Sequence, residues 1–230
     1  MASKKLLERL SECSVLVQVA LDFDNMLDAI SLAARLRDLG KPVILEAGTP
    51  LIKSAGMSAV ETLKAIPGSH LVMADTKTVD ASALELSMAS RAGADAFSIL
   101  SVAPVESIKE AVNASREYGL AVYGDMIASD NPLEDARTMR ELGVDVALLH
   151  VGVDVQKRLG LTASKLLSLI KDVKEEFRGP VAVAGGIKPG ETAMVVGAGA
   201  DIVIIGSAIT RASDPSSALR EALESAKPRC

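Results

Sequence analysis

The sequence alternates along its whole length between short apolar runs rich in β-branched residues and longer stretches with helical periodicity. The apolar runs have the length of strands, and their near-continuous apolar character is typical of parallel strands buried on both faces of a sheet. We therefore predict eight strands, at 16–23, 43–48, 70–77, 96–101, 121–127, 146–152, 181–187 and 201–207.

Glycines and helix signals mark the segments between these strands. Each of the seven helix-to-strand junctions carries a glycine, which tolerates the left-handed conformation that ends a helix. These are Gly40, Gly68, Gly93, Gly119, Gly143, Gly179 and Gly199. Three junctions nearly repeat, as Ala-Gly-Ala-Asp at 92–95 and 198–201 and Leu-Gly-Val-Asp at 142–145. One helical face is predicted at Leu166, Ile170, Val173 and Phe177, and Asp214-Pro215 predicts the start of a final helix.

Eight strand–helix units in 230 residues predict the α/β class and a single (β/α)8 TIM barrel. We expect residues 1–230 to form one domain, with a short helix at about 3–12 before the first strand. An open, doubly wound sheet is the alternative. It is disfavoured because the turn after the first strand reads Asp22-Phe23-Asp24-Asn25 instead of the Gly-x-Gly-x-x-Gly of a dinucleotide fold.

Composition excludes several classes of protein. The chain has 25 Lys and Arg against 30 Asp and Glu, and only three Phe, two Tyr and no Trp, so the basic stripe and stacking rings of a nucleic-acid binder are missing. No apolar run is long enough to span a membrane, and the first residues lack the apolar core of a signal peptide. Cys13 and Cys230, far apart in sequence, predict neither a disulfide framework nor a zinc site and are typical of a reducing cytosol. We expect a cytoplasmic protein.

Polar side chains gather where the predicted strands end. Active sites of such barrels lie at the carboxyl ends of the strands, and buried polar groups there need a functional reason. The group comprises Asp22, Glu46, Asp75, Lys77, Asp80, Asp125 and His150. His70 instead begins a strand, at the opposite face of the barrel, and is predicted to be structural. With only two histidines in the chain, chemistry that needs several imidazole ligands is excluded.

The last two strands end in glycine turns that favour phosphate binding. In barrels, these two loops often bind phosphate through backbone N–H groups, and Gly185, Gly186, Gly206, Ser207 and Ala208 are the candidate donors. Glu46 and Asp75 suit a hard divalent cation, since one or two carboxylates usually hold Mg²⁺ together with substrate oxygens. Mn²⁺ would suit them equally.

Asp75-Thr-Lys77-Thr-Val-Asp80 resembles the Asp-x-Lys-x-x-Asp signature of the orotidine 5′-monophosphate decarboxylase superfamily. Within it, the chain is most similar to the 3-hexulose-6-phosphate synthases, from about residue 16 to 220. The other stretches that carry the resemblance are Gln18-Val-Ala-Leu-Asp22, Glu46-Ala-Gly-Thr-Pro-Leu-Ile52, Gly124-Asp-Met-Ile127, His150-Val-Gly-Val-Asp-Val-Gln156, Val183-Ala-Gly-Gly-Ile187, Gly206-Ser-Ala-Ile-Thr210 and Asp214-Pro215.

The resemblance implies an Mg²⁺-dependent aldol condensation of D-ribulose 5-phosphate with formaldehyde to D-arabino-hex-3-ulose 6-phosphate, and the reverse reaction, through an enediolate. It implies that Glu46 and Asp75 hold the metal, that Lys77 stabilises the enediolate, and that Asp22 and Asp80 position Lys77 and the sugar hydroxyls. His150 is the implied acid/base, and the turns at 185–187 and 206–208, with Ile187 and Ala208, hold the phosphate. A homodimer is also implied, with Asp80 reaching the neighbouring site.

Two positions differ from related enzymes. Sister decarboxylases, which act on 3-keto-L-gulonate 6-phosphate, have arginine where this chain has Val153, which favours the synthase. Many superfamily members have arginine at the position of Ser207, so Lys188, Arg211 or a residue of the 153–163 loop is expected to replace it. That loop, with Lys157 and Arg158, is either a lid or a solvated turn.

Three alternative functions remain open. The first is the sister decarboxylase. The second is ribulose-phosphate 3-epimerase, which is disfavoured because it uses two metal-binding histidines. The third is a non-catalytic barrel that binds a sugar phosphate.

Overall fold

Eight parallel strands close into a barrel in chain order, with β1 hydrogen-bonded to both β2 and β8. The computed structural model describes residues 2–36, 42–150 and 163–230. The strands are β1 (Leu16–Leu21), β2 (Val43–Ala47), β3 (Leu71–Thr78), β4 (Ala96–Leu100), β5 (Ala121–Asp125), β6 (Val146–His150), β7 (Val181–Ala184) and β8 (Ile202–Ile205). All eight predicted strands and the (β/α)8 fold are confirmed.

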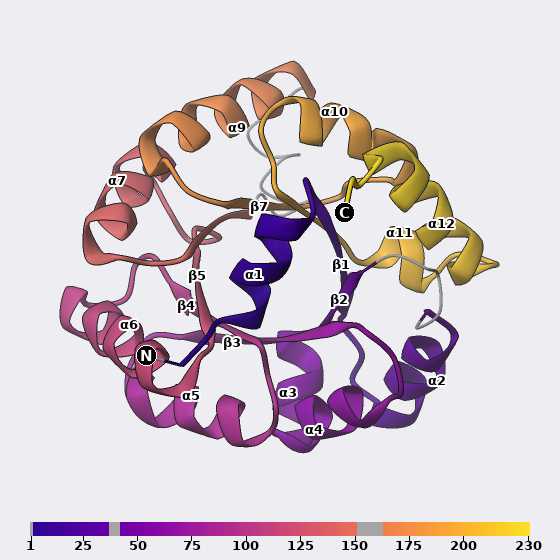
Figure 1. The fold of residues 1–230 in the computed structure, drawn as a ribbon, viewed down its shortest axis with the longest axis horizontal. Coiled ribbons are helices and arrows are strands. Elements are labelled where there is room, and N and C mark those ends of the chain that lie inside the picture. Colours follow the sequence, from indigo (N-terminus) through magenta and orange to yellow (C-terminus); the bar gives the residue numbers. More distant parts are fainter. Residues whose placement is uncertain (1, 37–41, 151–162) are drawn as a thin grey trace.

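Helices form a ring around the barrel (Figure 1). In the described residues they are α2 (Met26–Leu36), α3 (Thr49–Ala55), α4 (Ser58–Ala65), α5 (Ser82–Arg91), α6 (Val105–Tyr118), α7 (Pro132–Leu142), α9 (Ala163–Phe177), the 3₁₀ turn η1 (Pro189–Glu191), α10 (Thr192–Gly197), α11 (Ser207–Thr210) and α12 (Pro215–Ala226). The Asp214 side chain accepts from the N–H groups of Ser216 and Ser217, which confirms the predicted start of the last helix. No described helix is long and apolar enough to cross a bilayer.

Buried apolar side chains form two layers, one between strands and helices and one inside the barrel. The predicted face of α9 belongs to the outer layer, where Ile170, Val173 and Phe177 are buried and Leu166 packs against them. Tyr123, which is fully buried, is the one aromatic side chain among the described members of the inner layer. The barrel is therefore a packed core, and a cavity can open only at a mouth.

The helix predicted before the first strand is α1 (Lys5–Glu12), which crosses the middle of the ring (Figure 1). Leu6 is fully buried in the inner layer, and Leu7 and Leu10 pack against that layer. The amino-terminal mouth of the barrel is therefore closed by α1, and the carboxyl-terminal mouth is left for the site.

The repeated Gly-x-Asp junctions perform one structural task at three places. Each aspartate accepts a hydrogen bond from a backbone N–H of the preceding strand and one from a lysine. The sets are Asp95 with Val72 N at 2.8 Å and Lys64 Nζ at 2.6 Å, Asp145 with Val122 N at 2.8 Å and Lys4 Nζ at 2.6 Å, and Asp201 with Val181 N at 2.7 Å and Lys174 Nζ at 2.6 Å. Lys64 and Lys174 come from barrel helices, whereas Lys4 lies beside α1 and anchors it.

The predicted role of the junction glycines is confirmed at five positions. Gly68, Gly93, Gly119, Gly143 and Gly199 all have positive φ. The prediction is wrong at Gly179, because the left-handed residue is Arg178, with φ 57°. Gly40 lies outside the described residues.

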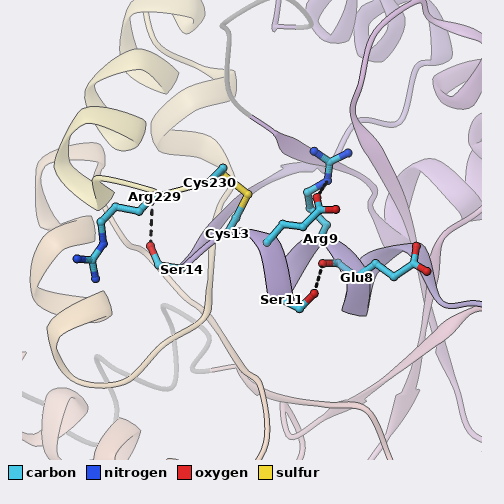
Figure 2. Close-up of a disulfide and its surroundings, with 8 residues drawn as sticks. Glu8, Arg9, Ser11, Cys13, Ser14, Arg229 and Cys230 are labelled. Atoms are coloured by element: carbon cyan, nitrogen blue, oxygen red, sulfur yellow. Dashed lines mark hydrogen bonds and ion pairs between the residues drawn. A yellow bond between two sulfur atoms is a disulfide. The ribbon is translucent and has the colours of Figure 1, made fainter.

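Cys13 and Cys230 form a disulfide (Figure 2), so the prediction of unlinked cysteines is wrong. Their 217-residue separation along the chain says nothing of their distance in a closed barrel, where first and last strands are neighbours. Hydrogen bonds from Ser14 N to Arg229 O (3.0 Å) and from Arg229 N to Ser14 Oγ (3.1 Å) hold the same two segments together. The cysteines therefore give no support to the predicted cytoplasmic location, because disulfides are rare in the cytosol of mesophiles.

Candidate functional site

A cavity of about 870 Å³ opens at the carboxyl ends of the strands. Of the residues predicted at the strand ends and glycine turns, all but Asp80 and Asp125 line it: Asp22, Glu46, Asp75, Lys77, His150, Gly185, Gly186, Ile187, Gly206, Ser207 and Ala208. The strand-end rule therefore located the cavity. Because consecutive parallel strands end at the same mouth, residues far apart in sequence meet there.

Lys77 lies between two carboxylates from different strands. Its Nζ is 2.5 Å from Asp75 Oδ2 and 3.3 Å from Asp125 Oδ2. Burial alone would lower the pKa of Lys77, but attraction by the two aspartates outweighs it and raises the pKa above its ordinary value. The cavity thus holds a fixed ammonium group that stays charged.

His150 is oriented by the same buried carboxylate. Its Nδ1 is 3.4 Å from Asp125 Oδ2, and Asp125 is 0% exposed. Burial raises the pKa of Asp125, but the bond and charge of His150, followed by the charge of Lys77, lower it below its usual value. With Nδ1 donating to Asp125, Nε2 of a neutral His150 keeps its lone pair and is the ring atom available as a base.

Glu46 is buried at the inner end of the cavity beside a chain of polar groups. Gln18 Nε2 donates to Glu46 Oε2 at 2.5 Å, and Tyr123 Oη donates to Gln18 Oε1 at 3.3 Å. Burial, followed by repulsion from Asp75, raises the pKa of Glu46 well above its ordinary value. Within the described ranges, no lysine, arginine or histidine forms an ion pair with this carboxylate.

Asp22 follows β1 and faces the open cavity. Desolvation by the surrounding protein raises its pKa, Asp75 raises it further, and Lys77 and His150 lower it in part. Gly48 leaves room for this side chain, since a Cβ at Gly48 would lie 2.2 Å from Asp22 Oδ1. Residue 48 must therefore stay small for Asp22 to hold its place.

The carboxylates of Glu46 and Asp75 fit a divalent cation. In the described residues no group of three or more His, Cys, Asp or Glu side chains is arranged as a metal cage. Mg²⁺ needs no such cage, because one or two carboxylates and substrate oxygens commonly hold it. Burial and, after it, repulsion from Asp75 raise the pKa of Glu46, and a cation held by the two carboxylates would favour the charged form of both.

The two glycine turns lie together on the cavity wall. Gly185 and Gly186 have φ of 124° and 65°, conformations that favour glycine. Ser207 and Ala208 begin α11, where the first backbone N–H groups of a helix have no partner within it. Of the predicted replacements for the missing arginine, Lys188 and Arg211 both line the cavity. Val153, Lys157 and Arg158 lie outside the described residues.

Asp80 is exposed and is not among the residues that line the cavity. His70, predicted to be structural, is buried, and its Nε2 lies 2.9 Å from Leu63 O.

Asp125 was expected at a strand end, but no role was predicted for it. Its position five residues into an apolar run was the available signal, whereas its contacts with both Lys77 and His150 depend on strand register.

Comparisons with known proteins agree with one another. The sequence model of the orotidine 5′-phosphate decarboxylase/HUMPS family matches residues 16–222. A curated 3-hexulose-6-phosphate synthase from Staphylococcus epidermidis is 37% identical over 205 residues, which cover 89% of this chain and 95% of that protein. A crystal structure of 3-hexulose-6-phosphate synthase is 34% identical, with a TM-score of 0.83, and the match covers 91% of this chain and 98% of that one. 3-Keto-L-gulonate-6-phosphate decarboxylase from Vibrio cholerae is 25% identical, with a TM-score of 0.80, over 93% of this chain and 98% of that one.

Proposed function

The chain belongs to the orotidine 5′-phosphate decarboxylase/HUMPS family, and on that premise we propose that it is a 3-hexulose-6-phosphate synthase. The proposed reaction is the aldol condensation of D-ribulose 5-phosphate with formaldehyde to D-arabino-hex-3-ulose 6-phosphate, and its reverse. The observation that carries the proposal is the arrangement of Lys77 and His150 around the buried Asp125, beside a cavity whose lining also includes both glycine turns.

The chain's own residues supply the charge and the proton transfer. His150 Nε2 takes the proton from C1 of the pentose phosphate, and the Lys77 ammonium stabilises the negative charge that then develops on the neighbouring oxygens. Asp125 holds His150 and Lys77 on one carboxylate. Asp22 positions Lys77 and the sugar hydroxyls.

We place Mg²⁺ at Glu46 and Asp75. Held by these two carboxylates, the ion would lower the cost of negative charge on the substrate oxygens. Gln18 orients the Glu46 carboxylate, and Thr49 Oγ1, at 2.7 Å, orients that of Asp75. The turns at 185–187 and 206–208 bind the phosphate. Lys188 and Arg211 supply the positive charge of the arginine that many superfamily members have at the position of Ser207.

We further propose that the protein is a homodimer in which Asp80 reaches the neighbouring site. Asp80 is exposed and does not line the cavity of its own chain, which supports this proposal. Five of the eight large apolar side chains that are exposed among the described residues lie on α5, at the first residue of α6 or in the loops before these helices: Val79, Leu84, Met88, Val102 and Val105. Since α5 and α6 pack side by side, these side chains form an apolar surface of the kind that a second subunit covers.

The first test is to incubate the protein with ribulose 5-phosphate, formaldehyde and Mg²⁺ and to follow formaldehyde loss with and without EDTA. We expect consumption that the chelator stops. Lys77→Ala and Asp75→Asn should fold normally, as judged by circular dichroism, and lose most of this activity. Full activity in both variants would refute the site.

The same preparation tests the alternatives. Release of CO₂ from 3-keto-L-gulonate 6-phosphate, with no formaldehyde loss, would identify the decarboxylase that the 25% identical structure represents. Binding of ribulose 5-phosphate without turnover of either substrate would identify a non-catalytic sugar-phosphate barrel.

A further inference from the structure

Three residues of β3 stand opposite one residue of β4, directly below the cavity. Ala74 pairs with Phe97 and Thr78 with Ile99, so 75–77 form a bulge opposite Ser98. Within the bulge Lys77 has φ 48°, a left-handed conformation that a non-glycine residue adopts only when its surroundings impose it. Lys77, which carries the ammonium group, and Asp75, a candidate metal ligand, therefore lie in irregular backbone. Other contacts must stabilise this backbone.

The Ser98 hydroxyl holds both of these residues. Lys77 N donates to Ser98 Oγ at 2.9 Å, and Ser98 Oγ donates to Asp75 Oδ1 at 2.9 Å. Because Lys77 Nζ is bonded to the other oxygen, Asp75 Oδ2, the ring of contacts is closed. Both ends of Lys77, its backbone and its ammonium, are therefore tied to the same carboxylate.

Ser98 acts through these residues and has no access to substrate. It is 0% exposed and is not among the residues lining the cavity. Its carbonyl oxygen also accepts a hydrogen bond from Thr76 Oγ1 at 2.8 Å, so Ser98 contacts every residue of the bulge. Removing the hydroxyl would leave the Lys77 N–H without its partner and free the Asp75 carboxylate to rotate.

We infer that Ser98 is a positioning residue, whose hydroxyl sets the orientation of Lys77 and Asp75 relative to each other. The inference rests on the proposed function, because it assigns Lys77 and Asp75 the roles given above. Misplacement of a reacting group by about 1 Å can cost roughly 10²-fold in rate. The phosphate-binding turns are on other strands, so a loss at Ser98 should appear in kcat and hardly in KM.

The experiment compares Ser98→Ala with Ser98→Thr, which retains a hydroxyl on the same carbon, and with Ser115→Ala. Ser115, on a barrel helix outside the cavity lining, is a matched control because it is equally buried and its hydroxyl also has two partners: it donates to Val112 O at 2.8 Å and accepts from Lys4 Nζ at 2.9 Å. We expect Ser98→Ala to lose about 10²-fold in kcat with less than about threefold change in KM for ribulose 5-phosphate. Ser98→Thr and Ser115→Ala should keep kcat within about threefold of the wild type. If Ser98→Ala does not fold, Ser98→Cys, whose thiol bonds weakly, takes its place with an expected loss of about tenfold.

A second readout does not depend on turnover. Mn²⁺ binding, followed by electron paramagnetic resonance of the free ion, should be about tenfold weaker in Ser98→Ala and restored in Ser98→Thr, because Asp75 loses its orienting donor. An unchanged kcat and Mn²⁺ affinity in Ser98→Ala would overturn the inference, as would losses in all three variants that follow their melting temperatures. If the wild type consumes no formaldehyde, the proposed function fails, and the Mn²⁺ affinities alone decide the role of Ser98.

Discussion

Lys77 and His150 share one buried carboxylate, so neither group works independently of the other. Asp125 is 0% exposed and lies 3.3 Å from the ammonium and 3.4 Å from the imidazole. A proton taken up by His150 places a second positive charge on Asp125 Oδ2, and its repulsion of Lys77 offsets part of the attraction between Lys77 and that carboxylate. Proton transfer at His150 is thus coupled to the strength of the field that Lys77 presents to the substrate.

Gly48 provides a test of Asp22 that leaves Asp22 itself unchanged. In Gly48→Ala the new Cβ would lie 2.2 Å from Asp22 Oδ1 and 3.0 Å from Leu21 O. Because the closest contact is the end of a side chain, we expect Asp22 to move while the fold persists, and kcat to fall by about tenfold or more.

Steady-state kinetics and a thermal melt check this prediction. The matched control is Gly197→Ala, where a Cβ would meet nothing within 4 Å, and which should leave kinetics unchanged. Unchanged kinetics in Gly48→Ala would show that Asp22 need not stay where the structure has it.

For single residues, the sequence predicted where a side chain lies better than which residues it contacts. The strand-end rule brought Asp22, Glu46, Asp75, Lys77 and His150 to one mouth, because parallel strands share their direction. The contacts of Asp125 and Ser98 depend on the register between strands and on a bulge, and apolar periodicity carries no information about either. Asp80 was assigned from resemblance alone, and its role stays a prediction.

At the level of the elements, strand starts were predicted more accurately than strand ends. β7 and β8 begin within one residue of the predicted 181–187 and 201–207, yet end at Ala184 and Ile205. The apolar run continues into the cavity loops, where backbones diverge and the ladder stops. The repeated aspartates were visible in the sequence, but the lysine that binds each of them was not. Lys4, for example, lies 141 residues before Asp145.

These aspartates predict an order of stability among variants at the closed mouth of the barrel. Asp145 accepts from Val122 N as well as from Lys4 Nζ, so Asp145→Ala leaves a buried backbone N–H without this partner. Lys4→Met removes the lysine contacts with Asp145 and Ser115 and leaves the bond from Val122 N in place. We expect Asp145→Ala to lower the free energy of unfolding by about 1–3 kcal/mol and Lys4→Met to lower it less.

Urea unfolding of both variants measures this order, and formaldehyde consumption provides the control, which should remain unchanged because the site is at the opposite mouth. A larger loss in Lys4→Met would mean that the aspartate serves mainly as an ion-pair partner of α1.

For the whole molecule, the two mouths of the barrel have separate tasks. The carboxyl-terminal mouth carries the cavity, and the amino-terminal mouth is closed by α1, which the Cys13–Cys230 disulfide joins to the last residue of the sequence (Figure 2). Both cysteines lie outside residues 16–222, the part that matches the family. The link therefore lies outside the matched part of the chain and away from the cavity.

Breaking this link should change stability and leave catalysis alone. A disulfide that closes a long loop restricts the unfolded chain, and its removal typically costs about 3 kcal/mol, or about 6–12 °C in Tm for a chain of this size. Cys13→Ser, Cys230→Ser and the reduced wild type should all show this loss with the same kcat. A mass for the untreated protein that matches two free thiols would show that the bond does not form.

The proposed dimer makes the most demanding prediction, because it requires two defective chains to repair each other. Asp80→Ala removes the side chain given to the neighbouring site, and Lys77→Ala removes the ammonium from the chain's own site, so each homodimer should be inactive. In a co-expressed mixture, half of the dimers pair the two variants, and each of these has one site with both groups intact. We expect about a quarter of wild-type activity.

Pairing Lys77→Ala with Asp75→Asn is the control: both changes affect the chain's own site, and no activity should return. An inactive Asp80→Ala and Lys77→Ala mixture that elutes as dimers would place Asp80 outside the neighbouring site, while elution as monomers would leave the apolar surface on α5 and α6 without its proposed partner.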